Sequence, residues 1–192
     1  MDGNTLRERT RGPGLYRADA EPFPALAELY RAIATGQTAR LRTAADDSLY
    51  QSFNATFHAI NCGEAVWPRS VAFYQADVAR SARLYPLTGG MPANITPCAF
   101  WPFKPAKPVR LADHGPANIL LVQNLRDPAT PYEGALRMRK ALGVQRTGMI
   151  TVDAGGHASY LTTPNKCSDA AATAFLLGGP LPRDLRCPSD GR

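Results

Sequence analysis

The sequence has no run that approaches the ~20 consecutive apolar residues of a membrane-spanning helix. Its first eleven residues are polar and charged, and they lack the apolar segment of a secretory signal peptide. No two cysteines form a C-x-x-C pair, and no cysteine and histidine have the spacing of zinc ligands. We therefore expect no membrane span, no signal peptide within these residues, no metal and no cofactor.

Lysine is also scarce, and nearly all of the basic side chains are arginines. The formal net charge is +6, but the arginines are spread along the whole chain and are interleaved with Asp and Glu. A nucleic-acid-binding surface needs its positive charge gathered on one face. We therefore expect no nucleic-acid partner. The few lysines are Lys104, Lys107, Lys140 and Lys166.

Cysteine occurs four times, which permits disulfide bonds. Four cysteines allow three pairings, and proximity in the sequence favours Cys62 with Cys98 and Cys167 with Cys187. Two disulfides would imply an oxidising compartment. The alternative is four buried free thiols in a cytosolic protein, since free cysteine is commonly buried.

Composition and hydrophobic periodicity divide the chain into three regions. Residues 1–22 are rich in Gly, Arg and Pro, which predicts irregular structure. Residues 23–107 predict a helical region and a proline-rich return, because apolar residues first recur at helical spacing and prolines then exclude a long helix or central strand. Residues 108–192 form the third region. The helical segments are predicted over 24–36, 39–45, 50–60 and 70–84.

The third region alternates strands and helices. Residues 118–123 form a continuous apolar run, typical of a strand buried on both faces of a parallel sheet. A helix should follow, with Thr130 as N-cap, Pro131 in its first position and Glu133 closing a capping box. Residues 149–152 predict a second strand and residues 166–177 a last helix. This order indicates an α/β fold with a parallel sheet.

Two polar residues follow the two predicted strands. Asp127 follows the first strand and His157 follows the second, so both should lie at the carboxyl edge of the sheet, where ligands and catalytic groups gather. Alone, Asp127 would equally suit a turn brace, and His157 would more often be a surface residue. An acid followed by a histidine on successive strand ends is, however, the order of α/β-hydrolases after their serine.

The amino-acid sequences of several segments strengthen this interpretation. Residues 119–131 (ILLVQNLRDPATP), 155–157 (GGH) and 165–167 (NKC), with 59–62 (AINC) and 97–102 (PCAFWP) upstream, resemble the tripeptidyl-aminopeptidase-like α/β-hydrolases. These are secreted or cell-envelope serine exopeptidases related to proline iminopeptidases. The resemblance covers roughly residues 24–187. It implies a partial α/β-hydrolase fold, with a helical cap remnant over 23–107 and the last strands and helices of the core over 108–192.

The same resemblance implies a function. Asp127 would be the acid of a catalytic triad and His157 its general base, while the cap would shape a pocket for the N-terminus of a peptide substrate. The complete family enzyme would release short peptides from peptide N-termini.

The sequence departs from the family in its nucleophile. No serine stands in a G-x-S-x-G motif on a strand-to-helix turn. Cys62 does not replace it, because its helical, aromatic surroundings do not favour a thiolate. His58 and His114 are expected on a helix surface and in a loop. We therefore expect the chain alone to be inactive, with a nucleophile-bearing N-terminal half as a possible partner.

Two other functions fit the same residues. The chain could be a non-catalytic peptide-binding or interaction module derived from a hydrolase. It could also be part of an esterase or epoxide hydrolase, since one fold carries many chemistries.

Overall fold

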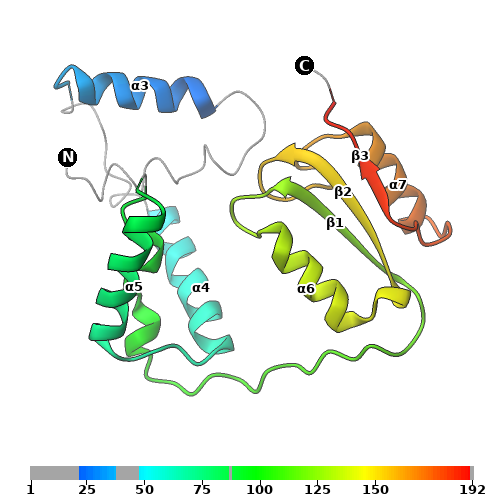
Figure 1. Cartoon of the computed structure of the whole chain (residues 1–192), viewed down its shortest axis with the longest axis horizontal. Coiled ribbons are helices and arrows are strands. Elements are labelled where there is room, and N and C mark those ends of the chain that lie inside the picture. The colour runs from blue at the N-terminus through cyan, green and yellow to red at the C-terminus, as the bar shows by residue number, and fades with distance from the viewer. Residues whose placement is uncertain (1–21, 38–47, 87, 191–192) are drawn as a thin grey trace. The chain divides into compact units, whose positions relative to one another are not determined.

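The computed structural model describes residues 22–37, 48–86 and 88–190 (Figure 1). The chain divides into two compact units. The described part of the first unit covers residues 32–37, 48–86 and 88–109, and that of the second covers 22–31 and 110–190. The helix predicted over 39–45 and the irregular segment 1–21 lie outside the described residues. The assignment of 23–107 to a cap stays a prediction.

The first described helix, α3, spans Pro22–Ala34 and so begins earlier than the predicted Pro24. Pro22 was expected to end the irregular segment, yet it is the first residue of this helix. Proline is tolerated there because the first N–H groups of a helix have no acceptor within it.

The first unit contains two longer helices and two short 3-10 helices. Helix α4 spans Ser48–Glu64 and α5 spans Val71–Leu84, with the Ser70 hydroxyl accepting from the Phe73 N–H as N-cap. Helix η3 (Met91–Ala93) packs on α5, and η4 (Pro97–Phe100) packs on α4. A disulfide between Cys62 and Cys98 joins α4 to η4. Between α5 and β1 the described residues form only short 3-10 helices, as the prolines predict.

The second unit is built on a parallel sheet. Strands β1 (Ile119–Arg126), β2 (Thr147–Gly155) and β3 (Leu185–Cys187) lie in the order β1-β2-β3, and both pairings are parallel. Helix α6 (Tyr132–Leu142) and the short η5 (Val144–Arg146) connect β1 to β2, and α7 (Lys166–Leu176) lies between β2 and β3. The predicted α/β fold with a parallel sheet is confirmed.

Helices cover both faces of this sheet. Successive side chains of a strand point to opposite faces. Ile150 and Val152 of β2 form the core with Ala172 of α7, whereas Thr151 lies 3.3 Å from the Tyr132 hydroxyl of α6. Helices α6 and α7 therefore lie on opposite faces, and Figure 1 shows α6 in front of the sheet and α7 behind it.

Two expectations for this unit need correction, and one strand was not expected. Thr130 does not cap α6: the N-cap is Pro131, without a side-chain cap hydrogen bond, because the Thr130 hydroxyl is bonded to Asp127. Residues 119–123 of β1 are only half-buried, since β1 lies at an edge of the described sheet. Strand β3 was not predicted, because three residues carry no readable periodicity.

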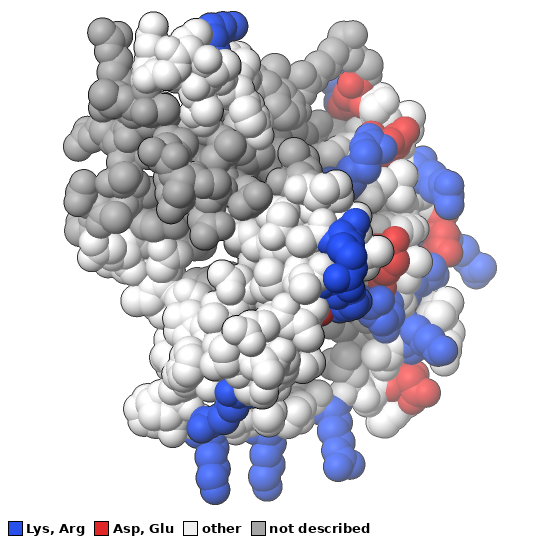
Figure 2. Space-filling model, turned by 60° about the vertical axis from the view of Figure 1, so that its left-hand side comes forward, with Lys and Arg blue, Asp and Glu red and all other residues white. Residues whose placement is uncertain are grey.

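The described surface bears on two expectations, the spread of positive charge and the absence of a membrane span. On the face drawn in Figure 2, Lys and Arg side chains stand in separate groups, and several groups have Asp or Glu beside them. Among the residues that the structure describes, no helix is both long and apolar enough to cross a bilayer. The expectation of no nucleic-acid partner stays a prediction.

Candidate active site

Asp127 and His157 lie at the carboxyl edge of the sheet. Arg126 at the end of β1 is in register with Gly155 at the end of β2, so the two strands end side by side. Asp127 directly follows β1, and His157 stands in the loop that follows β2. The structure thus brings together the two residues that the sequence singled out.

The two side chains are hydrogen-bonded. His157 Nδ1 lies 3.0 Å from Asp127 Oδ2 and 3.2 Å from Oδ1. The Asp127 side chain is only 3% exposed, whereas that of His157 is 42% exposed. The acid is therefore enclosed behind a histidine that solvent can reach.

Three further donors hold the Asp127 carboxylate. The N–H groups of Ala129 and Thr130 donate to Oδ1 at 2.8 and 2.9 Å, and the Thr130 hydroxyl donates to Oδ2 at 2.8 Å. Burial alone would raise the pKa of Asp127, but the bonds from Thr130, Ala129 and His157 together outweigh it and lower that pKa below its usual value. Asp127 is accordingly ionised at neutral pH.

The ionised acid determines the tautomer of the histidine. A carboxylate only accepts hydrogen bonds, so Nδ1 of His157 is the donor in this pair. In the neutral ring Nε2 then carries the lone pair and can accept a proton. An acid that orients a base in this way is the arrangement needed to activate a hydroxyl nucleophile.

The remaining titratable candidates lie elsewhere or are already bonded. Both predicted disulfides are present, Cys62–Cys98 and Cys167–Cys187. Cys62 therefore offers no thiolate. His114 is an exposed loop residue, as expected, near Asp113.

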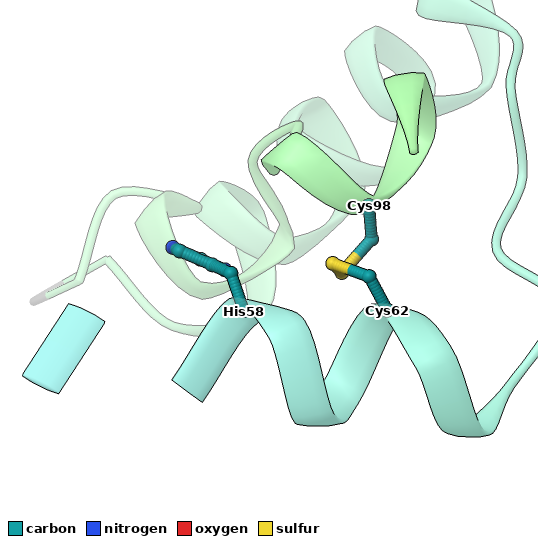
Figure 3. A group of neighbouring side chains, drawn as sticks. All are labelled: His58, Cys62 and Cys98. Carbon is teal, nitrogen blue, oxygen red and sulfur yellow. A yellow bond between two sulfur atoms is a disulfide. The ribbon is translucent and has the colours of Figure 1, made fainter. Parts of the chain in front are cut away.

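His58 lies close to one of the disulfides. Figure 3 shows it on α4, one turn before Cys62, with its ring and the Cys62–Cys98 bond on the same side of the helix. Its ring nitrogen and the two sulfurs lie within 4.8 Å of one another. Because the sulfurs are bonded to each other, they are not thiolate ligands, and this group is not a metal site in the disulfide form.

Four of the described serines lie within a helix, at a helix cap or in a buried hydrogen bond, and none of these settings is a nucleophile elbow. Ser52 and Ser81 lie within α4 and α5, and Ser70 caps α5. Ser159 is buried, and its hydroxyl donates to Asn124 Oδ1 at 2.9 Å.

Sequence reasoning missed two residues that support the pair. Thr130 was assigned to a helix cap, although a threonine three residues after an acidic residue also suits a hydroxyl bond to that acid. Asn124 directly follows the predicted strand 118–123, and the sequence analysis gives it no role of its own. A polar residue at the end of such a run was the available signal for it.

Comparison with known proteins finds a matching family model and several similar proteins. Residues 85–187 match the model of a family described as "TAP-like protein". The chain is 33% identical over 173 residues to a tripeptidyl aminopeptidase of Streptomyces coelicolor. The aligned region covers 84% of the chain and 31% of that protein. It is 30% identical over 149 residues to carboxylesterase B of Mycobacterium tuberculosis, covering 73% of the chain and 28% of the relative.

A third relative is named as a serine protease. This protein of Mycobacterium tuberculosis is 32% identical over 96 residues, which cover 50% of the chain and 17% of the relative. The chain thus spans at most about a third of the length of these curated relatives.

Proposed function

Because this chain belongs to the TAP-like family of α/β-hydrolases, we propose that it supplies the acid and the general base of a serine hydrolase that acts on peptides. The observation that carries the proposal is the hydrogen bond between His157 Nδ1 and the buried carboxylate of Asp127. The pair stands at the carboxyl ends of adjacent parallel strands, which is where this fold holds its catalytic groups.

In the proposed reaction His157 moves one proton twice. Its Nε2 takes the proton from a serine hydroxyl as the oxygen attacks the scissile carbonyl carbon, and the imidazolium is stabilised by ionised Asp127. The imidazolium then gives the proton to the leaving amine as the C–N bond breaks. In the second half of the reaction Nε2 takes a proton from water as the water oxygen attacks the acyl carbon. It returns that proton to the serine oxygen as the ester C–O bond breaks, which releases the acyl product and restores the serine.

The serine in this proposal comes from a segment outside these 192 residues. The printed sequence has no G-x-S-x-G motif. In the described sheet β1 has a strand on one side only, and an eight-residue strand with a free edge is a natural place for another strand to pair. Both observations support a partner segment that carries the nucleophile and extends the sheet.

A fluorophosphonate probe tests where the nucleophile lies. We expect no labelling of the chain alone, and serine labelling of the added segment once a nucleophile-bearing segment is combined with the chain. Labelling of a serine within the chain alone would contradict the proposal. His157→Ala in the combined protein should abolish labelling, and His58→Ala should leave it intact.

The proposed substrates are peptides with a free N-terminus, from which short peptides are released. This proposal rests on the similarity to the tripeptidyl aminopeptidase, while the carboxylesterase relative favours ester hydrolysis as a second candidate. A tripeptide anilide and a matched acyl ester, assayed with the active protein, separate the two. Release of the tripeptide, lost when its amino group is blocked, supports the first; hydrolysis of the ester alone supports the second.

We also propose that the protein works in an oxidising compartment, because both of its cysteine pairs are disulfides. Thiol labelling of protein taken directly from its native cells is the test. No labelled cysteine is expected without a reductant, and four labelled cysteines would contradict the proposal.

A further inference from the structure

Asn124 makes an unusual set of hydrogen bonds at the end of β1. The residue is completely buried. Its Nδ2 lies 3.0 Å from the carbonyl oxygen of Gly156, 3.4 Å from that of Gly155 and 3.5 Å from that of Ala158. Its Oδ1 accepts the hydroxyl of Ser159 at 2.9 Å. One side chain therefore holds the backbone on both sides of His157.

Beyond Gly155, the last residue of β2, the backbone held in this way has no regular secondary structure. Gly156 has φ +87° and Ala158 has φ +63°, the second in a left-handed conformation that a residue with a Cβ adopts only under constraint. His157 lies between these two residues, and its ring direction depends on both. The Asn124 amide fixes the carbonyls of the same two residues.

We propose that Asn124 is a positioning residue for His157, so that the end of β1 fixes both members of the pair. Asp127 acts directly on the imidazole, and Asn124 acts through the loop that carries it. The proposed role rests on the proposed function of His157 as general base. It predicts that loss of the amide displaces Nδ1 from Asp127 even though Asp127 is unchanged.

A purely structural role would have a different signature. A buried asparagine stabilises a fold wherever its polar atoms are bonded. Asn165 is the matched control: it is also buried, its Oδ1 accepts from the Ser168 N–H to cap α7, and its Nδ2 donates to the Pro188 carbonyl at 2.9 Å. The Asn165 side chain makes no hydrogen bond to the described residues 155–159.

The test is the imidazole tautomer of His157, measured by ¹⁵N NMR on the full 192-residue chain at about pH 8.5, which is about two units above the pKa of histidine in model peptides. The chain has only three histidines, and His58→Gln and His114→Gln assign the signals. We expect the Nδ1–H form in the unaltered protein. Asn124→Ala should convert it to a mixture of tautomers and abolish the low-field Nδ1 proton signal.

The controls separate positioning from stability. Asn165→Ala should lower the melting temperature and leave the His157 tautomer unchanged. Ser159→Ala removes one of the four hydrogen bonds of the Asn124 side chain and should give a smaller shift toward mixed His157 tautomers. This variant tests the positioning role if Asn124→Ala does not fold.

An unchanged tautomer in a folded Asn124→Ala protein, or in Ser159→Ala if only that variant folds, would overturn the proposal. The measurement needs no hydrolysis. Absence of peptidase and esterase activity in the combined protein would count against the proposed function and would leave the result on Asn124 in place.

Discussion

Thr130 shows how a local pattern at the residue scale can support two structures. The Thr130-Pro131-x-Glu133 pattern predicts a helix cap, yet the hydroxyl donates to Asp127 and α6 begins without a side-chain cap. A charge-assisted bond to a buried carboxylate is stronger than a neutral cap bond. The Thr130 hydroxyl therefore donates to Asp127, and the residues between Asp127 and α6 hold its carboxylate.

Replacing Thr130 tests this interpretation. Thr130→Val keeps the shape and the backbone N–H but removes the hydroxyl, so the pKa of Asp127 should rise toward its ordinary value. Carboxyl ¹³C NMR of Asp127 measures the change. Thr130→Ser retains a hydroxyl and should restore the low pKa. Equal pKa values in the Val and Ser variants would show that the hydroxyl does not stabilise the carboxylate.

The lowered pKa of Asp127 also predicts how stability depends on pH. The unfolded chain holds this proton up to a higher pH than the folded one, with an unfolded pKa of about 3.9, so folding stability rises with pH between the two values. The stabilisation is complete above the unfolded pKa and is lost as pH falls through the folded pKa.

Asp127→Asn should remove this dependence. In denaturant titrations below about pH 5, the unaltered protein should lose stability more steeply than the variant, and the two curves should run parallel above that range. Parallel curves throughout the acid range would contradict the lowered pKa.

Elements that carry their own pattern were predictable, and those that depend on a neighbour were not. The apolar runs gave β1 and β2, and helical spacing gave α4, α5 and α7 to within a few residues. Strand β3 exists because Leu185, Arg186 and Cys187 pair with β2 and Cys187 is bonded to α7. No three-residue pattern specifies such a partner.

Gly148 marks a close approach that the sequence did not reveal. A Cβ at this position of β2 would lie 2.0 Å from the Pro182 carbonyl oxygen, so the segment leading to β3 packs directly on the strand backbone. Small-to-large changes in packed regions cost ~1–3 kcal/mol. Glycine is therefore required here for packing.

A pair of glycine variants tests this packing. Gly148→Ala should destabilise the protein by about 2 kcal/mol in denaturant unfolding. Gly134→Ala lies within α6, where an added Cβ meets nothing within 4 Å, and it should stabilise by about 0.5–1 kcal/mol. A neutral Gly148→Ala would show that the approach of Pro182 is not tight.

At the scale of the whole molecule, each unit has its own covalent link. Cys62–Cys98 closes a separation of 36 residues in the first unit, and Cys167–Cys187 closes one of 20 in the second. The second joins α7, whose N-terminus follows the His157 loop, to β3. The disulfides therefore constrain each unit independently.

Removing either disulfide should destabilise the unit that contains it. Loop closure predicts losses of about 4 kcal/mol for Cys62→Ser/Cys98→Ser and about 3 kcal/mol for Cys167→Ser/Cys187→Ser. Hydrogen exchange resolved by residue measures which unit opens. Equal loss of protection in both units after removal of one bond would contradict this independence.

The sequence predicted the family and the Asp127–His157 pair because two signals can be recognised without a structure. They are the position of each residue after a predicted strand and the local sequence similarity to the family. It did not predict Thr130 or Asn124 as supports, because their roles depend on contacts that only the folded loop creates. The carbonyls bonded by Asn124 lie 31 to 34 residues further along the chain. Contacts of that range have no local signature.

The most direct test of the account is the turnover of a tripeptide anilide by the active protein, formed with its nucleophile-bearing segment and carrying Asp127→Asn or His157→Ala. We predict that kcat falls by roughly 10⁴-fold in each variant with little change in KM, because the pair acts on the transition state and does not bind the substrate. His58→Ala should retain full activity. Turnover at the unaltered rate in either Asp127→Asn or His157→Ala would contradict the assignment of acid and base.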